Sequence, residues 1–147
     1  MRFLSILFQT KIFKITGTFF ILLALSACIE PPYNNLDNAQ LKDMLSQGVP
    51  VYDVRRPEEW RQTGVIKGSK LLTFVDARGN VLNDFMPRFT SKIDRNTPVI
   101  LICRSGNRSG TLAKHLVEQM GYTQVYNVRN GINQWLREKQ PTTPAKY

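Results

Sequence analysis

Short apolar runs of strand length alternate along the chain with longer stretches in which apolar residues recur at helical spacing. Residues 98–102 (PVILI) form an unbroken apolar run of strand length, which favours a buried strand. Residues 108–120 carry apolar side chains at helical spacing and are followed by Gly121, which predicts an amphipathic helix with a glycine stop. The apolar residues on its inner face are Leu112, Ala113, Leu116, Val117 and Met120. A buried strand that runs into a covering helix is the basic unit of an α/β fold.

The same alternation predicts further strands and helices on both sides of this pair. A helix is expected between Asp37, as its N-cap, and Gly48, as its stop. Pro57 suits the first turn of a second, short helix. The remaining candidates are strands over residues 49–54, 70–75 and 124–128, and helices over residues 83–93, interrupted at Pro87, and 132–139. We therefore predict an α/β fold, with a doubly wound sheet of mainly parallel strands and helices on both faces.

The start of the chain has the pattern of an export signal. Arg2, Lys11 and Lys14 precede an uncharged, largely apolar stretch at residues 15–29, which is shorter than the roughly 20 residues that a membrane-spanning helix needs. Residues 25–28 (LSAC) resemble the lipobox of bacterial lipoproteins, whose signal is cleaved before a cysteine that then receives lipid. A plain signal peptide that contains a cysteine and an uncleaved anchor are the two alternatives.

This interpretation divides the chain into four parts. We expect a signal peptide over residues 1–27, a lipidated Cys28 and tether over residues 28–35, a folded domain over residues 36–139, and a flexible tail over residues 140–147. The protein would then be exported and lipid-anchored to a bacterial membrane, facing the periplasm or the cell exterior.

Length, charge and composition exclude further classes of function. The 147 residues suffice for one ordinary domain. The net charge is +9, but three cations belong to the predicted signal, so the remaining chain carries +6. No run of five basic residues occurs, which argues against a nucleic-acid partner. One His and two Cys do not make a metal site, and no dinucleotide-binding glycine motif is present, so no metal or cofactor is expected. We also expect a monomer.

The candidate chemistry lies between the strongest strand and the strongest helix, at residues 103–109 (CRSGNRS). Beyond the carboxyl end of a parallel strand, loop amides and the N-terminus of the next helix form an anion site, and Gly106 permits the positive φ that such a loop needs. These features favour the thiolate of Cys103, which is therefore the candidate nucleophile. The candidate substrate-binding residues are Arg104, Ser105, Gly106, Asn107 and Arg108. A buried core cysteine at the end of a strand is the alternative.

This loop is similar to the active-site loop of rhodanese domains, the sulfurtransferases that carry sulfur as a cysteine persulfide. The likeness runs from about residue 36 to residue 138. It includes VYDVR at 51–55, EW at 59–60, GVIKGS at 64–69, GY at 121–122, VYNV at 125–128, GI at 131–132 and Trp135. Val65 stands where the family often has histidine, and Asn130 replaces a usual glycine. The resemblance implies a rhodanese-like fold.

The resemblance also implies an activity, that of a thiosulfate sulfurtransferase (rhodanese)-like enzyme. Cys103 would take sulfur from a small anionic, thiosulfate-like donor and pass it to a thiol or cyanide acceptor. Asp53, Arg55 and Glu59 would support the loop. By residue type, Ser105 and Ser109 are expected to cap the helix that follows and not to act as nucleophiles. Arg108 would either face the substrate or pair inward with Glu59 or Asp53.

Two other classes of function stay open. The chain could be a non-catalytic or carrier rhodanese module that binds small anions or persulfide, or an enzyme like a phosphatase or arsenate reductase. Four residues separate Cys103 from Arg108, one fewer than in rhodanese-like phosphatases of the cell-cycle type. A shorter ring of amides suits a sulfur atom better than a phosphate, so the loop length favours sulfur transfer.

Overall fold

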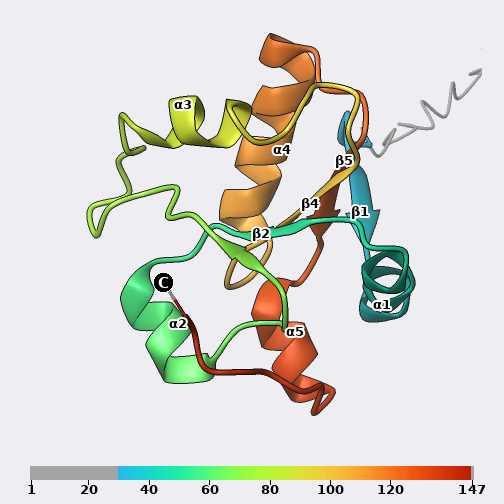
Figure 1. The fold of residues 1–147 in the computed structure, drawn as a ribbon, viewed down its shortest axis with the longest axis vertical. Coiled ribbons are helices and arrows are strands. Elements are labelled where there is room, and N and C mark those ends of the chain that lie inside the picture. The colour runs from blue at the N-terminus through green and yellow to red at the C-terminus, as the bar shows by residue number, and fades with distance from the viewer. Residues whose placement is uncertain (1–29, 147) are drawn as a thin grey trace, which may run out of the picture.

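The computed structural model describes residues 30–146, and the predicted signal and Cys28 lie outside this range. Five parallel strands form one sheet in the order β1-β5-β4-β2-β3 (Figure 1). The strands are β1 (Asn34–Leu36), β2 (Val51–Asp53), β3 (Lys70–Leu71), β4 (Val99–Ile102) and β5 (Val125–Val128). The helices are α1 (Asn38–Ser46), α2 (Pro57–Thr63), α3 (Phe85–Thr90), α4 (Asn107–Met120) and α5 (Gly131–Arg137). None of the helices within residues 30–146 is long and apolar enough to cross a membrane.

Local sequence signals account for the ends of the helices. The Asp37 carboxylate accepts the backbone N–H of Gln40, and the Gln40 side chain accepts the backbone N–H of Asp37, so α1 begins with a reciprocal capping box. Gly121 follows α4 with φ of 73°, in the left-handed conformation that glycine adopts without strain. Both predicted helix ends are confirmed.

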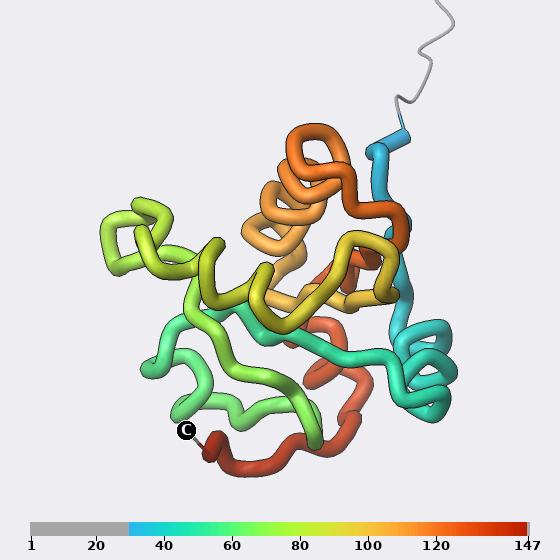
Figure 2. The backbone as a smooth tube through the Cα atoms, turned by 45° about the horizontal axis from the view of Figure 1, so that its top comes forward, coloured from blue at the N-terminus to red at the C-terminus, as the bar shows by residue number. Residues whose placement is uncertain are grey.

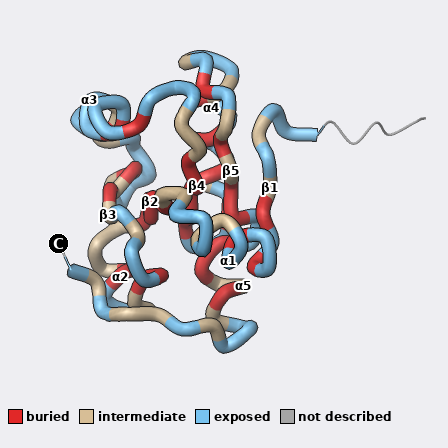
Figure 3. The backbone as a smooth tube through the Cα atoms, turned by 45° about the vertical axis from the view of Figure 1, so that its right-hand side comes forward, coloured by how far each residue is buried: buried red, intermediate tan, exposed pale blue. Residues whose placement is uncertain are grey.

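Two apolar cores, one on each face of the sheet, hold the helices in place. Every residue of β4 is buried, and its side chains alternate between the two cores. Leu101 and Cys103 join the core under α3 and α4, whereas Ile100 and Ile102 join the core under α1 and α5. Figure 3 shows β4 coloured as buried. The predicted α/β fold with helices on both faces is confirmed. Because the strands are parallel, their carboxyl ends meet at one edge of the sheet, where Cys103 lies.

Both ends of the predicted domain are more ordered than the sequence indicated. Asn34 and Asn35, assigned to the tether, belong to β1 and pair with Tyr126 and Asn127 of β5. The tail was predicted to be loose, but Thr143 pairs with Val65 in an antiparallel bridge. Each segment finds backbone partners on a distant element, which no local pattern of apolar residues signals.

Candidate active site

Cys103 follows β4 directly and lies at the base of its loop. Its side chain is only 1% exposed. The Sγ atom accepts a hydrogen bond from the backbone N–H of Gly106 at 3.2 Å and lies 3.3 Å from the hydroxyl of Ser109, which can also donate to it. The N-terminus of α4 is therefore aimed at the sulfur, and its partial positive charge favours a negative charge there.

The start of the loop is fixed by α5. The backbone N–H groups of Ile132 and Asn133 donate to the carbonyl oxygens of Cys103 and Arg104, at 2.9 and 3.1 Å. In a trans peptide the N–H points opposite to the carbonyl of the same peptide unit. The N–H groups of Arg104 and Ser105 consequently point away from α5. Two helix N-termini thus build the site, since α4 faces the sulfur and α5 holds the first two peptide units.

Two glycines let the loop pack this closely. Gly106 has φ of 92°, which confirms the predicted left-handed turn, and a Cβ there would lie 1.9 Å from the carbonyl oxygen of Arg129. Gly131 has φ of 57°, and a Cβ there would lie 2.4 Å from the carbonyl oxygen of Cys103. A side chain at Gly106 would displace the backbone at Arg129, and a side chain at Gly131 would displace the backbone at Cys103 and Arg104.

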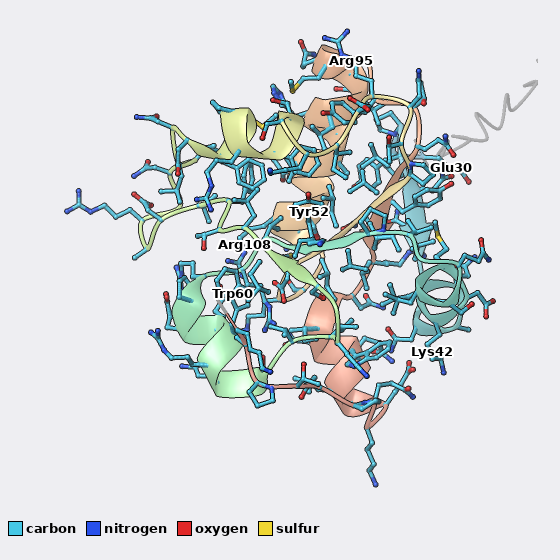
Figure 4. All side chains as sticks on the ribbon, viewed as in Figure 1. Glu30, Lys42, Tyr52, Trp60, Arg95 and Arg108 are labelled. Carbon is cyan, nitrogen blue, oxygen red and sulfur yellow. The ribbon has the colours of Figure 1, made fainter. Side chains whose placement is uncertain are left out.

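Arg108, which is labelled in Figure 4, pairs inward with Glu59 of α2. Its Nη1 and Nη2 atoms donate to the two carboxylate oxygens at 2.7 and 2.6 Å, the bidentate geometry that arginine and carboxylate favour. The Glu59 side chain is 11% exposed and that of Arg108 25%. Burial by itself would raise the pKa of Glu59, but the hydrogen bonds from Arg108 and from the Arg56 backbone outweigh it and lower that pKa. The Glu59 hydrogen bond in turn raises the pKa of Arg108.

The Asp53–Arg55 pair supports α2. It does not hold the loop directly, in contrast to the role that the family resemblance implies. Asp53 is fully buried and Arg55 is 1% exposed, with an ion pair of 2.6 Å between them. The remaining Arg55 N–H groups donate to the Glu59 carbonyl, the Thr63 hydroxyl and the Gly64 carbonyl. Within residues 30–146, Arg55 is therefore connected to the loop through α2, which carries Glu59.

The sequence that forms this site matches a known protein family. The model of the rhodanese-like domain matches residues 37–138. The chain belongs to the rhodanese-like domain family.

Several proteins that are similar to this chain are named for sulfur transfer. A sulfurtransferase from Allochromatium vinosum is 32% identical over 110 residues, which cover 74% of this chain and 92% of that protein. Thiosulfate sulfurtransferase GlpE from Tolumonas auensis is 38% identical over 56 residues, 38% of this chain and about half (52%) of GlpE. The solved structure of a polysulfide-sulfur transferase homodimer from Wolinella succinogenes has a TM-score of 0.62 at 22% identity and covers 79% of this chain and 82% of that chain, which supports the fold. Sulfur transfer is the general activity that these findings support.

Ser109 is the residue of this rhodanese loop that sequence reasoning misjudged. It was predicted to cap α4, together with Ser105, but Gly106 occupies the N-cap position and no side chain caps the helix. The Ser109 hydroxyl is fully buried and lies 3.3 Å from both Cys103 Sγ and the Gly106 carbonyl oxygen. Ser109 lies in the first turn of α4, three residues after Gly106, and a helical side chain leans toward the N-terminus of its helix, here toward the cysteine.

The rim of the rhodanese loop carries the exposed polar residues. Arg104, Ser105 and Asn107 are all exposed, so the loop presents a cation at its mouth. A cleft of about 430 Å³ lies beside the loop between β1, α4 and the end of β5, with Lys114 and Arg129 among its lining residues. Within residues 30–146, no three His, Cys, Asp or Glu side chains cluster closely enough to hold a metal ion.

Proposed function

We propose that this rhodanese-like protein transfers sulfur from a thiosulfate-like donor to a thiophilic acceptor through a persulfide on Cys103. In the first step the Cys103 thiolate attacks the outer sulfur of the donor. A new S–S bond forms, the bond to the sulfonate breaks, and sulfite leaves with the bonding electron pair. In the second step a thiolate or cyanide attacks the outer sulfur, and Cys103 leaves as a thiolate. Such a two-step exchange gives ping-pong kinetics.

The observation that carries this proposal is the environment of the sulfur. Cys103 Sγ meets the Gly106 amide and the Ser109 hydroxyl at the N-terminus of a 14-residue helix. Preorganised donors of this kind stabilise negative charge without reorganisation during the reaction. They stabilise the thiolate that attacks the donor and that is formed again when the acceptor takes the sulfur.

An anionic donor fits the charges around the loop. Arg104 is exposed at the rim, whereas Arg108 is held by Glu59. We therefore assign the first contact with the donor to Arg104 and the shape of the loop to Arg108. The short loop between Cys103 and Arg108, with four intervening residues, supports a sulfur donor over a phosphate ester.

Intact-protein mass spectrometry before and after thiosulfate tests this function. We expect the purified protein to gain one sulfur atom and to lose it on addition of cyanide. Cys103→Ser should gain none while keeping the circular dichroism spectrum of the parent. If the folded parent with a titratable thiol gains no sulfur, the persulfide mechanism is wrong. A gain without turnover would instead identify a carrier module.

We further propose that the protein is an exported lipoprotein anchored through Cys28. The pattern of residues 25–28 supports this, and β1 begins at Asn34, so only a short tether separates the lipid from the sheet. The tether enters at the amino ends of the parallel strands, opposite to the edge that carries Cys103. Cys28→Ala should release the protein from the membrane fraction without loss of sulfur transfer. Unchanged fractionation would contradict lipidation.

A further inference from the structure

The segment that follows the matched family domain is attached to two elements of that domain. We call residues 140–146 the C-terminal strap. At its start, the backbone N–H of Gln140 donates to the carbonyl of Trp135 at 3.0 Å. The indole N–H of Trp135 donates in turn to the carbonyl of Pro141 at 2.9 Å. These two bonds fix the strap to α5, because Trp135 is itself buried in the core under α5.

The strap then runs from α5 to the far end of α2 (Figure 2). There Thr143 and Val65 exchange two backbone hydrogen bonds, at 2.8 and 2.9 Å. Gly64 lies directly against this bridge, since a Cβ on Gly64 would be 2.8 Å from the Thr143 carbonyl oxygen. The strap therefore contacts the chain where it leaves α2.

The exit from α2 is tied to the buried arginine. The Gly64 carbonyl accepts from Arg55 at 2.9 Å, and the same guanidinium donates to Thr63 at 2.6 Å. Arg55 is held by the Asp53 carboxylate at the end of β2. The carboxyl end of α2 is thus fixed from one side by the sheet, through Arg55, and from the other by the strap, through Val65.

We propose that the C-terminal strap positions the active-site loop through α2. This inference deepens the proposed function and rests on it. Helix α2 has only seven residues, too few to hold its place by helical hydrogen bonds alone, so its position depends on its attachments. It carries Glu59, whose carboxylate holds Arg108 of the loop. A shift of α2 therefore moves the partner of Arg108, and with it the peptide groups around Cys103.

Thr143→Pro tests the backbone bridge between the strap and Val65. Proline removes the N–H that Thr143 donates to Val65, whereas Thr143→Ala keeps it and serves as the matched control. At a temperature where all variants stay folded, we expect Thr143→Pro in the full chain to slow persulfide formation from thiosulfate by about tenfold, because small displacements of positioned groups are costly. Thr143→Ala should stay within about twofold of the parent, since its backbone bonds are intact. Truncation after Lys139 provides a second variant with a larger expected loss.

A double-mutant cycle with Glu59→Gln shows whether the strap acts through α2. Contacts in one network have non-additive effects, so the combined variant Thr143→Pro with Glu59→Gln should be slowed much less than the product of the two single effects. Multiplicative effects would overturn the inference, as would parental rates in both Thr143→Pro and the truncated chain. A stability loss alone, with unchanged rates, would also overturn it.

A second readout separates this inference from the proposed function. The rate at which iodoacetamide alkylates Cys103, measured across pH, reports the loop environment without any sulfur donor. We expect Thr143→Pro to alter this profile and Thr143→Ala to preserve it. If no variant forms a persulfide but the alkylation profiles still differ in this way, the proposed donor fails and the strap inference holds. If persulfide forms and the profiles coincide, the strap inference fails by itself.

Discussion

Replacing Glu59 by Gln is the sharpest test of how the loop is held. Glutamine has nearly the same shape as glutamate and keeps an oxygen that can accept from the Arg56 backbone, so the helix start is preserved. It loses the charge that faces Arg108 and one of the two bonds of 2.6 and 2.7 Å to that guanidinium. The guanidinium is then left partly buried without a full partner.

The expected cost follows from the exposure of the pair. Removing one partner of a fully buried ion pair costs about 3–5 kcal/mol, and exposed pairs contribute about 0–1 kcal/mol. Glu59 and Arg108 are 11% and 25% exposed, between these limits. We therefore expect Glu59→Gln to lower the free energy of unfolding by about 2 kcal/mol at pH 7, with a Tm lower by about 8 °C for a domain of this size.

Urea unfolding of the parent, Glu59→Gln and Glu58→Gln provides the comparison. Glu58 is the matched control, because it pairs with Arg56 at 2.6 Å but is 46% exposed, so its loss should cost less than about 1 kcal/mol. The pKa of Glu59 is lowered in the folded state from its usual 4.5. Its contribution is therefore complete above pH 4.5 and disappears as the pH falls through the lower folded pKa.

The difference in unfolding free energy between the parent and Glu59→Gln should shrink accordingly below about pH 4.5. Equal costs for Glu59→Gln and Glu58→Gln at pH 7 would refute the conclusion that the Glu59–Arg108 pair supports the loop. A difference that does not change with pH would refute the assignment of the effect to the charge of Glu59.

Three further changes test the loop itself. Ser109→Ala should slow persulfide formation by about tenfold, the effect of one lost hydrogen bond to a charged sulfur, while the Tm changes by only a few degrees; an unchanged stopped-flow rate would show that the hydroxyl does not assist Cys103. Gly131→Ala should lower the unfolding free energy by more than about 1 kcal/mol, because its φ is 57° and a Cβ would meet the Cys103 carbonyl; parental stability in a thermal melt would contradict this packing. Inserting one residue between Gly106 and Asn107 should raise the KM for thiosulfate, and an unchanged KM would show that loop length does not select the donor.

Much of the site could be predicted because it is encoded locally. A strand that is apolar throughout, a cysteine at its end, a glycine that permits a left-handed turn and an amphipathic helix are consecutive in residues 98–120. Their order along the chain is enough to place Cys103 at the N-terminus of α4. The N-cap at Asp37 and the glycine stop after α4 were predicted for the same reason, since both depend on hydrogen bonds between near neighbours.

The sequence by itself therefore determined the fold class and the place of Cys103 in a loop between β4 and the N-terminus of α4. Only the tertiary structure decided that Arg108 pairs with Glu59, 49 residues away, and that the strap meets Val65, 78 residues from Thr143. It also paired Asn34 with Tyr126 in the sheet. Side-chain periodicity reports which face of an element is buried, but the partner on that face depends on how separate elements pack. Contacts that join distant parts of the chain depend on how the elements pack in the two cores, which no local pattern specifies.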